Sequence, residues 1–246
     1  MKVVHISDTH GAKFHTQLEI PECDLLIHSG DIGGRTTAME LYEFLSWFNV
    51  QPARKKVWCA GNHDLALDKK WILNTIDPIN QGIRQAMYGS AQAVLEQFPS
   101  IKYLEYTDYV FEGVKMYGLP ITPSFHKQNW AFNADRGDEI KKYVDRIPKD
   151  VNILISHGPP YGILDTIPEE YKLTPDEDIH RGCEELRTAM QHKLIDLKLS
   201  CFGHIHGNTG VIVAPISNTR HIIFSNGAVI NDQYKLVVKK PLIINL

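Results

Sequence analysis

The sequence predicts an α/β fold, because two observations point the same way. Short apolar runs alternate with segments of helical periodicity along most of the 246 residues, which is typical of βαβ units. Small clusters of Asp, His and Gly directly follow several of the apolar runs. No linker, low-complexity tract or short repeat divides the chain, so we expect one domain spanning residues 1–246.

The first half of the chain shows the alternation most clearly. Runs of strand length are expected at residues 3–7, 24–28 and 57–60. Helical spacing of apolar side chains predicts helices over residues 37–49 and 76–98, and Pro99 follows the second as a stop signal. Two further helices are expected over residues 138–146 and 182–193. The remaining strands are expected at residues 103–106, 109–111, 114–119, 152–156, 199–202, 210–213, 221–224, 234–238 and 242–244.

Composition restricts the functional classes. Hydrophobic residues make up 43% of the chain and charged residues 22%, and the formal net charge is −3, so nothing favours nucleic-acid or membrane binding. No apolar stretch approaches the roughly 18 to 20 residues of a membrane span. The sequence opens directly into a predicted strand, so we expect no removable leader. The four cysteines lack CxxC spacing, so we expect free thiols and a cytoplasmic protein.

Five motifs, each at the end of a predicted strand, contain residue types that bind metals. They are Asp8-Thr9-His10, Gly30-Asp31, Gly61-Asn62-His63-Asp64, Ser156-His157-Gly158 and Gly203-His204-Ile205-His206. Together they supply the oxygen and nitrogen donors that two adjacent divalent metals require. Each motif alone is weak evidence, since a lone histidine is usually structural. Their joint occurrence, with five of the 12 histidines inside them, predicts a dinuclear metal site.

The spacing within each motif suits this chemistry. An extended Asp8-x-His10 places both side chains on one side of the backbone. Asp31 has two carboxylate oxygens and could bridge two metals, with a helix N-cap as its alternative role. His63, beside the site but off the metal, could donate a proton to a departing alkoxide. Asp64 could orient that imidazole or serve as a helix N-cap.

The order of the motifs resembles that of the calcineurin-like metallophosphoesterase superfamily, from Asp8 to His206. A closer resemblance is to the metallophosphoesterase-domain-containing phosphodiesterases, a subgroup similar to class III cyclic-nucleotide phosphodiesterases. It rests on DTHG at residues 8–11, DLLIHSGD at 24–31, NWAFNADRG at 129–137, SHGPPYGILD at 156–165 and FGHIHG at 202–207. Many phosphoprotein phosphatases extend the second motif as GDxxDRG, whereas Gly34 replaces the second Asp here, which argues against that class.

The resemblance implies two mixed β-sheets packed as a sandwich and flanked by helices, with the site on loops at one sheet edge. It implies that the first metal is held by Asp8, His10, Asp31 and His206. It implies that the second metal is held by Asp31, Asn62, His157 and His204. Asp31 would bridge the two metals, and His63 would remain as the acid. Manganese is the expected metal, with iron, zinc, cobalt and nickel open.

The expected activity is hydrolysis of small phosphodiesters, cyclic or linear nucleotides among them, by attack of a metal-bridging hydroxide. A phosphomonoesterase, a nuclease and a metal-binding regulatory protein with little activity remain alternatives. Asn62, His63 and Arg136 are the expected substrate contacts. The loop from Phe125 to Arg136 either stacks a base or binds phosphate, or its aromatic side chains pack. A homodimer is one open assembly, and no membrane or nucleic-acid partner is expected.

Overall fold

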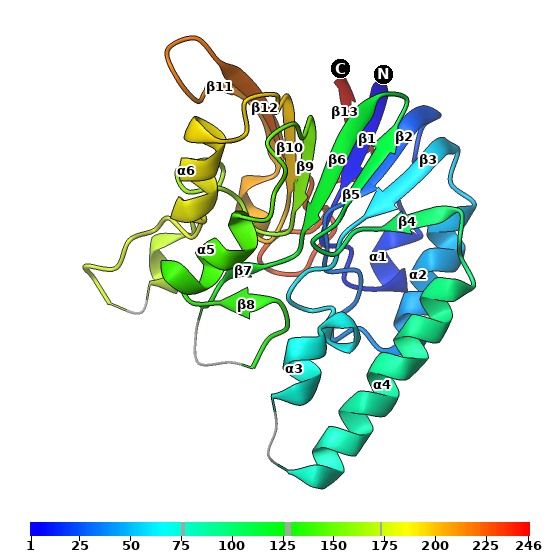
Figure 1. Ribbon diagram of the computed structural model, residues 1–246. Helices are drawn as coiled ribbons and strands as arrows, with labels where there is room; N and C mark the ends of the chain where they lie inside the picture. The colour runs from blue at the N-terminus through cyan, green and yellow to red at the C-terminus, as the bar shows by residue number, and fades with distance from the viewer. Residues whose placement is uncertain (75–76, 126–128, 173) are drawn as a thin grey trace.

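The computed structural model describes residues 1–74, 77–125, 129–172 and 174–246. Within these residues, one sheet has the strand order β13-β1-β2-β3-β4 and a second has the order β11-β12-β10-β9-β6-β5, while β7 and β8 form a small third sheet (Figure 1). The first sheet contains β1 (Lys2–Ile6), β2 (Cys23–His28), β3 (Ala53–Trp58), β4 (Ile101–Tyr103) and β13 (Leu242–Asn245). The second contains β5 (Asp108–Phe111), β6 (Val114–Leu119), β9 (Ile153–Ser156), β10 (Leu199–Phe202), β11 (Gly210–Pro215) and β12 (His221–Asn226). The third pairs β7 (Thr122–Pro123) with β8 (Asn133–Ala134).

Both large sheets are mixed, as expected. In the first, β13 pairs with β1 in the antiparallel sense, whereas β1 to β4 are parallel. In the second, β6, β9, β10 and β12 are parallel, and the edge strands β5 and β11 are antiparallel. Parallel strands therefore occupy the centre of each sheet, and their carboxyl ends meet at one edge.

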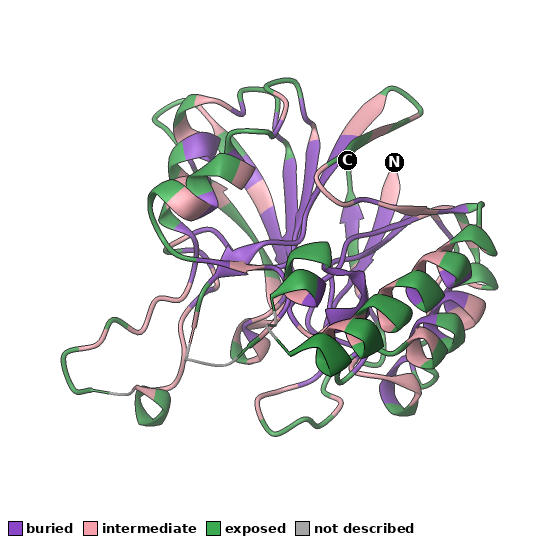
Figure 2. Cartoon of the chain, turned by 60° about the horizontal axis from the view of Figure 1, so that its bottom comes forward, coloured by how far each residue is buried: buried purple, intermediate pink, exposed green. Residues whose placement is uncertain are grey.

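Side-chain alternation along the strands explains the layers. Leu25 and Ile27 of β2 pack against Ile153 and Leu199 of the other sheet, so these residues form the layer between the two sheets. Leu26 points the other way, into a core shared with the helices on the outer face. The central strands β2, β9 and β10 are accordingly buried, whereas the edge strands β5 and β11 and the outer faces of the helices are more exposed (Figure 2). The expected helix-flanked sandwich is confirmed.

The helices fall into two groups, one on each outer face (Figure 1). The first sheet is covered by α1 (Ala12–His15), α2 (Ala38–Asn49) and α4 (Pro78–Glu96), with α3 (Lys69–Leu73) beside α4. The second is covered by α5 (Asp138–Val144) and α6 (Glu184–His192). Single 3₁₀ turns occur at Leu65–Leu67, Glu169–Tyr171 and His206–Asn208. No described helix combines the length and apolar character needed to cross a membrane.

Two predicted strands need correction, and some short elements were not expected. The strand expected at 234–238 is absent from the described chain, because Asn231 Oδ1 accepts the backbone N–H groups of Gln233 and Lys235 and turns the segment into a tight loop. The strand expected at 103–106 is displaced to Ile101–Tyr103. The short helices α1 and α3 were not expected, and Ile76, the predicted start of α4, lies outside the described residues.

Two buried histidines lie beneath the edge where the strands end. His5 on β1 bonds through Nδ1 to Ser225 Oγ of the other sheet (2.7 Å) and through Nε2 to Ser29 Oγ (2.9 Å). His28 on β2 bonds to Thr9 Oγ1 (3.0 Å). Burial lowers the pKa of each imidazole to about 3. Both are therefore neutral links, and His5 joins the two sheets directly.

Because of these two histidines, we expect the protein to lose stability in mild acid. Their folded pKa values lie below the ordinary value near 6.5, so below that pH the unfolded chain binds protons that the folded chain excludes. The unfolding free energy should fall by about 2 kcal/mol per histidine between about pH 7.5 and about pH 5, measured by urea denaturation. His5→Gln should flatten this dependence, and His221→Gln, at an exposed position, should not. Equal slopes in the two variants would contradict the prediction.

Candidate metal centre

The five motifs meet at the edge where the parallel strands of both sheets end. Asp8, Asp31 and Asn62 follow β1, β2 and β3 of the first sheet. His157 follows β9 and His204 follows β10 of the second sheet. The sandwich thus brings together residues separated by up to 198 positions, as in the contact between Asp8 and His206.

The carboxylate of Asp31 lies at the centre of this cluster. Its Oδ2 atom is 3.3 Å from His157 Nε2, 3.7 Å from His10 Nε2 and 4.0 Å from His63 Nε2. Its Oδ1 atom accepts the backbone N–H of His63 (2.8 Å), and the side chain is 2% exposed. Three imidazoles from different strand ends therefore face one buried carboxylate.

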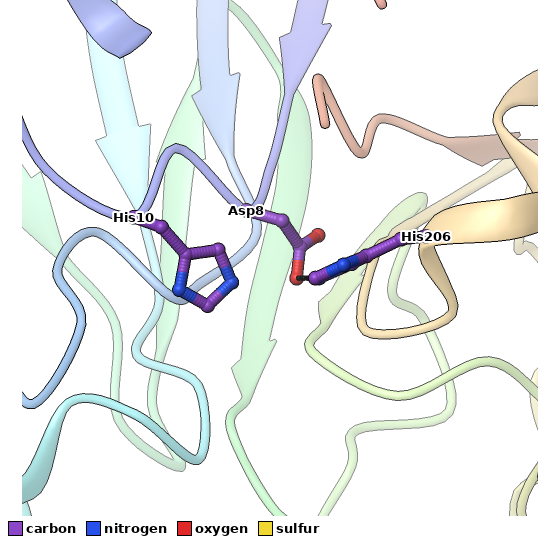
Figure 3. A group of neighbouring side chains, drawn as sticks. All are labelled: Asp8, His10 and His206. Carbon is purple, nitrogen blue, oxygen red and sulfur yellow. Dashed lines mark hydrogen bonds and ion pairs between the residues drawn. The ribbon is translucent and has the colours of Figure 1, made fainter. Parts of the chain in front are cut away.

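Asp8 organises the other side of the cluster. Its Oδ1 atom is 3.3 Å from His206 Nε2, and the imidazoles of His10 and His206 flank the carboxylate in Figure 3. The backbone N–H of His204 donates to both carboxylate oxygens (3.1 and 3.0 Å). This contact fixes the loop after β10 against the end of β1.

Asn62 and His157 complete the set. Asn62 Oδ1 lies 3.0 Å from His157 Nε2, and His157 Nδ1 lies 2.9 Å from the carbonyl oxygen of Ser29. Because a carbonyl oxygen only accepts, Nδ1 carries the hydrogen, which leaves Nε2 directed at Asp31 and Asn62. The ring of His204 lies 5.0 Å from that of His157.

The donor set fits divalent cations. Both ring nitrogens of His10 are buried and have no hydrogen-bond partner within the described part of the chain. Ligand atoms of three groups lie within 4.8 Å of one another: Asp8, His10 and His206; His10, Asp31 and His63; and Asp8, Asp31 and His157. A buried imidazole without a partner is costly, and a bound cation would satisfy it.

The charges support the same conclusion. Burial lowers the pKa of His10 to about 4 and that of His204 to about 3, so both are neutral donors. Burial also acts to lower the pKa of His157, but the adjacent Asp31 carboxylate raises it overall to about 9. The pKa of Asp31 in turn lies well below its usual value, since the effect of His157, His63 and His10 exceeds that of burial. A cation that binds here replaces a proton on His157.

The backbone is strained at these same positions. Asp8, His10, Asp31 and His204 adopt left-handed conformations, with φ of 54°, 42°, 59° and 66°. Non-glycine residues rarely adopt this region, and such strain concentrates at functional sites. Glycine is required at position 203, where a Cβ atom would overlap Asp8 Oδ2. The glycines of the motifs therefore permit the close approach of the strand ends.

The role expected for Asp64 needs correction. Its carboxylate does not orient the imidazole of His63, whose Nδ1 lies 2.6 Å from the carbonyl oxygen of Gly34 instead. Asp64 is fully buried and accepts hydrogen bonds from the backbone N–H groups of Asp31, Ile32 and Gly61 and from Thr36 Oγ1. Its side chain also makes no N-cap hydrogen bond. Asp64 therefore holds the backbone of the loop that carries Asp31.

In the loop from Phe125 to Arg136, some side chains pack in the core and others lie at the site. Residues 126–128 of this loop lie outside the described chain. Phe132 is 1% exposed and belongs to the core, whereas the ring of Trp130 lies 4.2 Å from that of His63. Arg136 donates to the carbonyl oxygens of Gly182 (2.7 Å) and Arg181 (3.1 Å). It lines a cavity of about 240 Å³ that reaches His204.

Sequence reasoning missed one aromatic residue at the site. The ring of Tyr234 lies 5.1 Å from that of His10 and 5.6 Å from that of His206. No motif lies near Tyr234 in the sequence. A strand was expected at this position, whereas the structure has a loop that places Tyr234 at the site. The left-handed φ of 53° at Tyr234 is the structural sign of that loop.

This fold and this site define a metal-dependent phosphoester hydrolase. The chain belongs to the calcineurin-like phosphoesterase family, whose model matches residues 1–208 and whose members bind divalent metals in a dinuclear site. It is 30% identical over 251 residues to metallophosphoesterase domain-containing protein 1 of Homo sapiens, and equally to that of Mus musculus, covering 100% of this chain and 71% of theirs. The fold matches the crystal structure of a phosphopantetheinyl hydrolase from Mycobacterium tuberculosis, with a TM-score of 0.57, 17% identity and coverage of 95% of this chain and 90% of that one. These comparisons confirm the resemblance found in the sequence.

Asp64→Ala tests the corrected role of this carboxylate. Four hydrogen bonds to a fully buried group are lost, so the unfolding free energy should fall by about 3 kcal/mol or more, and Mn²⁺ should bind more weakly. Urea denaturation and calorimetry measure the two effects. Asp77→Ala removes an exposed N-cap and should cost about 1 kcal/mol without changing metal affinity. Unchanged stability in Asp64→Ala, with a lower catalytic rate, would restore the role expected from the sequence.

Proposed function

We propose that the protein is a dinuclear-metal-dependent phosphodiesterase that hydrolyses small phosphodiesters. The observation that carries the proposal is the convergence of His10, His63 and His157 on one oxygen of Asp31, at 3.3 to 4.0 Å. A carboxylate in that position has donors on both sides and suits a bridging role between two cations.

The proposed ligands follow the two sides of Asp31. One cation is assigned to Asp8, His10, Asp31 and His206. The other is assigned to Asp31, Asn62, His157 and His204. Imidazole, carboxylate and amide donors without a thiolate suit Mn²⁺, Fe, Zn²⁺, Co²⁺ or Ni²⁺, and we propose Mn²⁺.

Two bound cations supply positive charge for the phosphate oxygens and lower the pKa of a water nucleophile. The protein's own residues do the rest. His157 is held in one tautomer by the Ser29 carbonyl, and Asp8 fixes the loop of His204. His63 is the proposed acid: Nδ1 bonds to Gly34, which leaves Nε2 to donate a proton to the leaving oxygen.

The cavity beside His204 supports a small substrate. Phe125 and Tyr171 line it, together with Arg136 and Arg181. Its volume of about 240 Å³ is below the roughly 300 Å³ at which pockets for drug-sized ligands begin. Such a space accepts one planar group with hydrogen-bond acceptors, such as a nucleobase, and we propose cyclic or linear nucleotides as candidate substrates, with Arg136 as a contact.

We also propose a single domain in the cytoplasm. The four cysteines are free and buried, which suits a reducing compartment. All the proposed ligands come from one chain, so the site does not require a second copy, and a homodimer remains one open assembly.

The proposal predicts Mn²⁺-dependent cleavage of an aryl phosphodiester. Metal-free protein should be inactive, and Mn²⁺ should restore hydrolysis of bis-p-nitrophenyl phosphate in preference to p-nitrophenyl phosphate. Asp31→Asn removes the bridging charge and should lower kcat by about 1,000-fold or more, because both cations lose a ligand. Initial rates with a metal titration measure both effects.

The remaining outcomes identify the alternatives. Preference for the monoester would indicate a phosphomonoesterase. Salt-sensitive binding and cleavage of DNA would indicate a nuclease. Bound metal without turnover of any phosphoester would indicate a regulatory protein. Asp196→Asn is the matched control, because it makes the same substitution at an exposed position that supplies none of the proposed ligands.

A further inference from the structure

The imidazole of His63 is contacted on three sides. Its Nδ1 lies 2.6 Å from the Gly34 carbonyl oxygen, and the ring of His10 meets it edge to face at 4.6 Å. The indole of Trp130 covers a third side, with ring centroids 4.2 Å apart and planes inclined by 34°. His63 Nε2 remains directed toward Asp31 Oδ2, 4.0 Å away.

Trp130 is itself held in place by its neighbours on both sides. Three hydrogen bonds anchor them: Trp71 Nε1 to the Asn129 carbonyl (2.9 Å), the Ala131 N–H to the Asn62 carbonyl (3.2 Å) and the Phe132 N–H to Asp68 Oδ2 (2.6 Å). The loop is thereby fixed to the segment that carries His63. The backbone on both sides of Trp130 is therefore held in place, and from there the indole contacts the imidazole of His63.

A single hydrogen bond does not fix the plane of an imidazole. The bond to Gly34 leaves the ring free to tilt, and a small displacement of a reacting group lowers rates strongly. Trp130 also lines a cavity of about 510 Å³, and the Arg35 guanidinium lies 5.3 Å from the centroid of its ring, so removing the indole would leave open space beside the imidazole.

We propose that Trp130 is a positioning residue, which holds the His63 imidazole so that Nε2 faces the leaving oxygen. The inference rests on the proposed function, because Trp130 acts only through His63. It identifies a residue outside the five motifs that the reaction requires. Trp130 is half-buried and also packs against the core that contains Phe132, so the experiment must separate positioning from packing.

Leaving-group dependence separates positioning from a structural role. An alkyl alkoxide needs a proton as it departs, whereas p-nitrophenolate does not. Trp130→Ala should therefore lower kcat about 100-fold for the alkyl ester bond of a dialkyl phosphodiester but less than about 3-fold for bis-p-nitrophenyl phosphate. KM should change little for either substrate, and Trp130→Phe should recover most of the lost rate.

Two further variants complete the experiment. His63→Ala should show the same dependence on the leaving group as Trp130→Ala. Trp71→Phe removes the anchor on Asn129 but not the ring against His63, and should lower both rates equally and by little. In Trp130→Ala the downfield ¹H NMR signal of the His63 Nδ1–H should broaden or disappear, while the bound metal content stays unchanged.

Equal losses on both substrates in Trp130→Ala, or loss of bound metal, would overturn the inference and show a structural role. Leaving-group dependence in His63→Ala without any in Trp130→Ala would overturn the inference alone and leave the acid in place. Absence of that dependence in His63→Ala would overturn both the inference and the acid role. The activity of Asp31→Asn tests the metal centre separately. A failure of the positioning inference can therefore be told apart from a failure of the proposed function.

Discussion

The structure depends on one buried carboxylate, that of Asp31. A charged group that is 2% exposed is costly unless opposite charges or hydrogen-bond donors compensate it. Three imidazoles and a backbone N–H surround it, and Asp64 holds the backbone on which it stands. The left-handed backbone of Asp31 and the glycines beside it follow from the same requirement, because strand ends with ordinary side chains could not come this close.

Packing of the two sheets against each other brings the residues of the site together, because each sheet supplies some of them. Each sheet contributes parallel strands that end at the same edge, so a short loop after each strand delivers its donors to one place. Below that edge, His5 bonds to Ser225 across the interface between the sheets. A neutral, hydrogen-bonded histidine in that position joins the two sheets next to the edge that carries the site.

The sequence predicted the residues that converge, but not how they are held. The apolar runs and the motifs after them were sufficient, since the ends of parallel strands share an edge. The hydrogen-bond partners of His63 and His157 could not be predicted. They are the backbone carbonyl oxygens of Gly34 and Ser29, and every residue has such an oxygen, so the sequence does not mark them. For the same reason neither role expected for Asp64, orienting His63 or capping a helix, matches the hydrogen bonds that its carboxylate makes. Tyr234 was missed because the apolar residues that follow it resemble a strand, whereas local hydrogen bonds to Asn231 Oδ1 turn the chain there.

His63 belongs to a group of side chains that could hold a metal, yet it differs from His10 and His157 in its position. Its Nε2 is farther from Asp31 Oδ2, at 4.0 Å against 3.3 Å for His157, and its side chain is 15% exposed where those of His157 and His10 are 0% and 2%. A ligand gains from burial and closeness, whereas an acid must reach a substrate that arrives from solvent. The indole of Trp130 keeps His63 at this intermediate position. The geometry thus favours His63 as the group that meets the substrate, and leaves the more buried imidazoles for the cations.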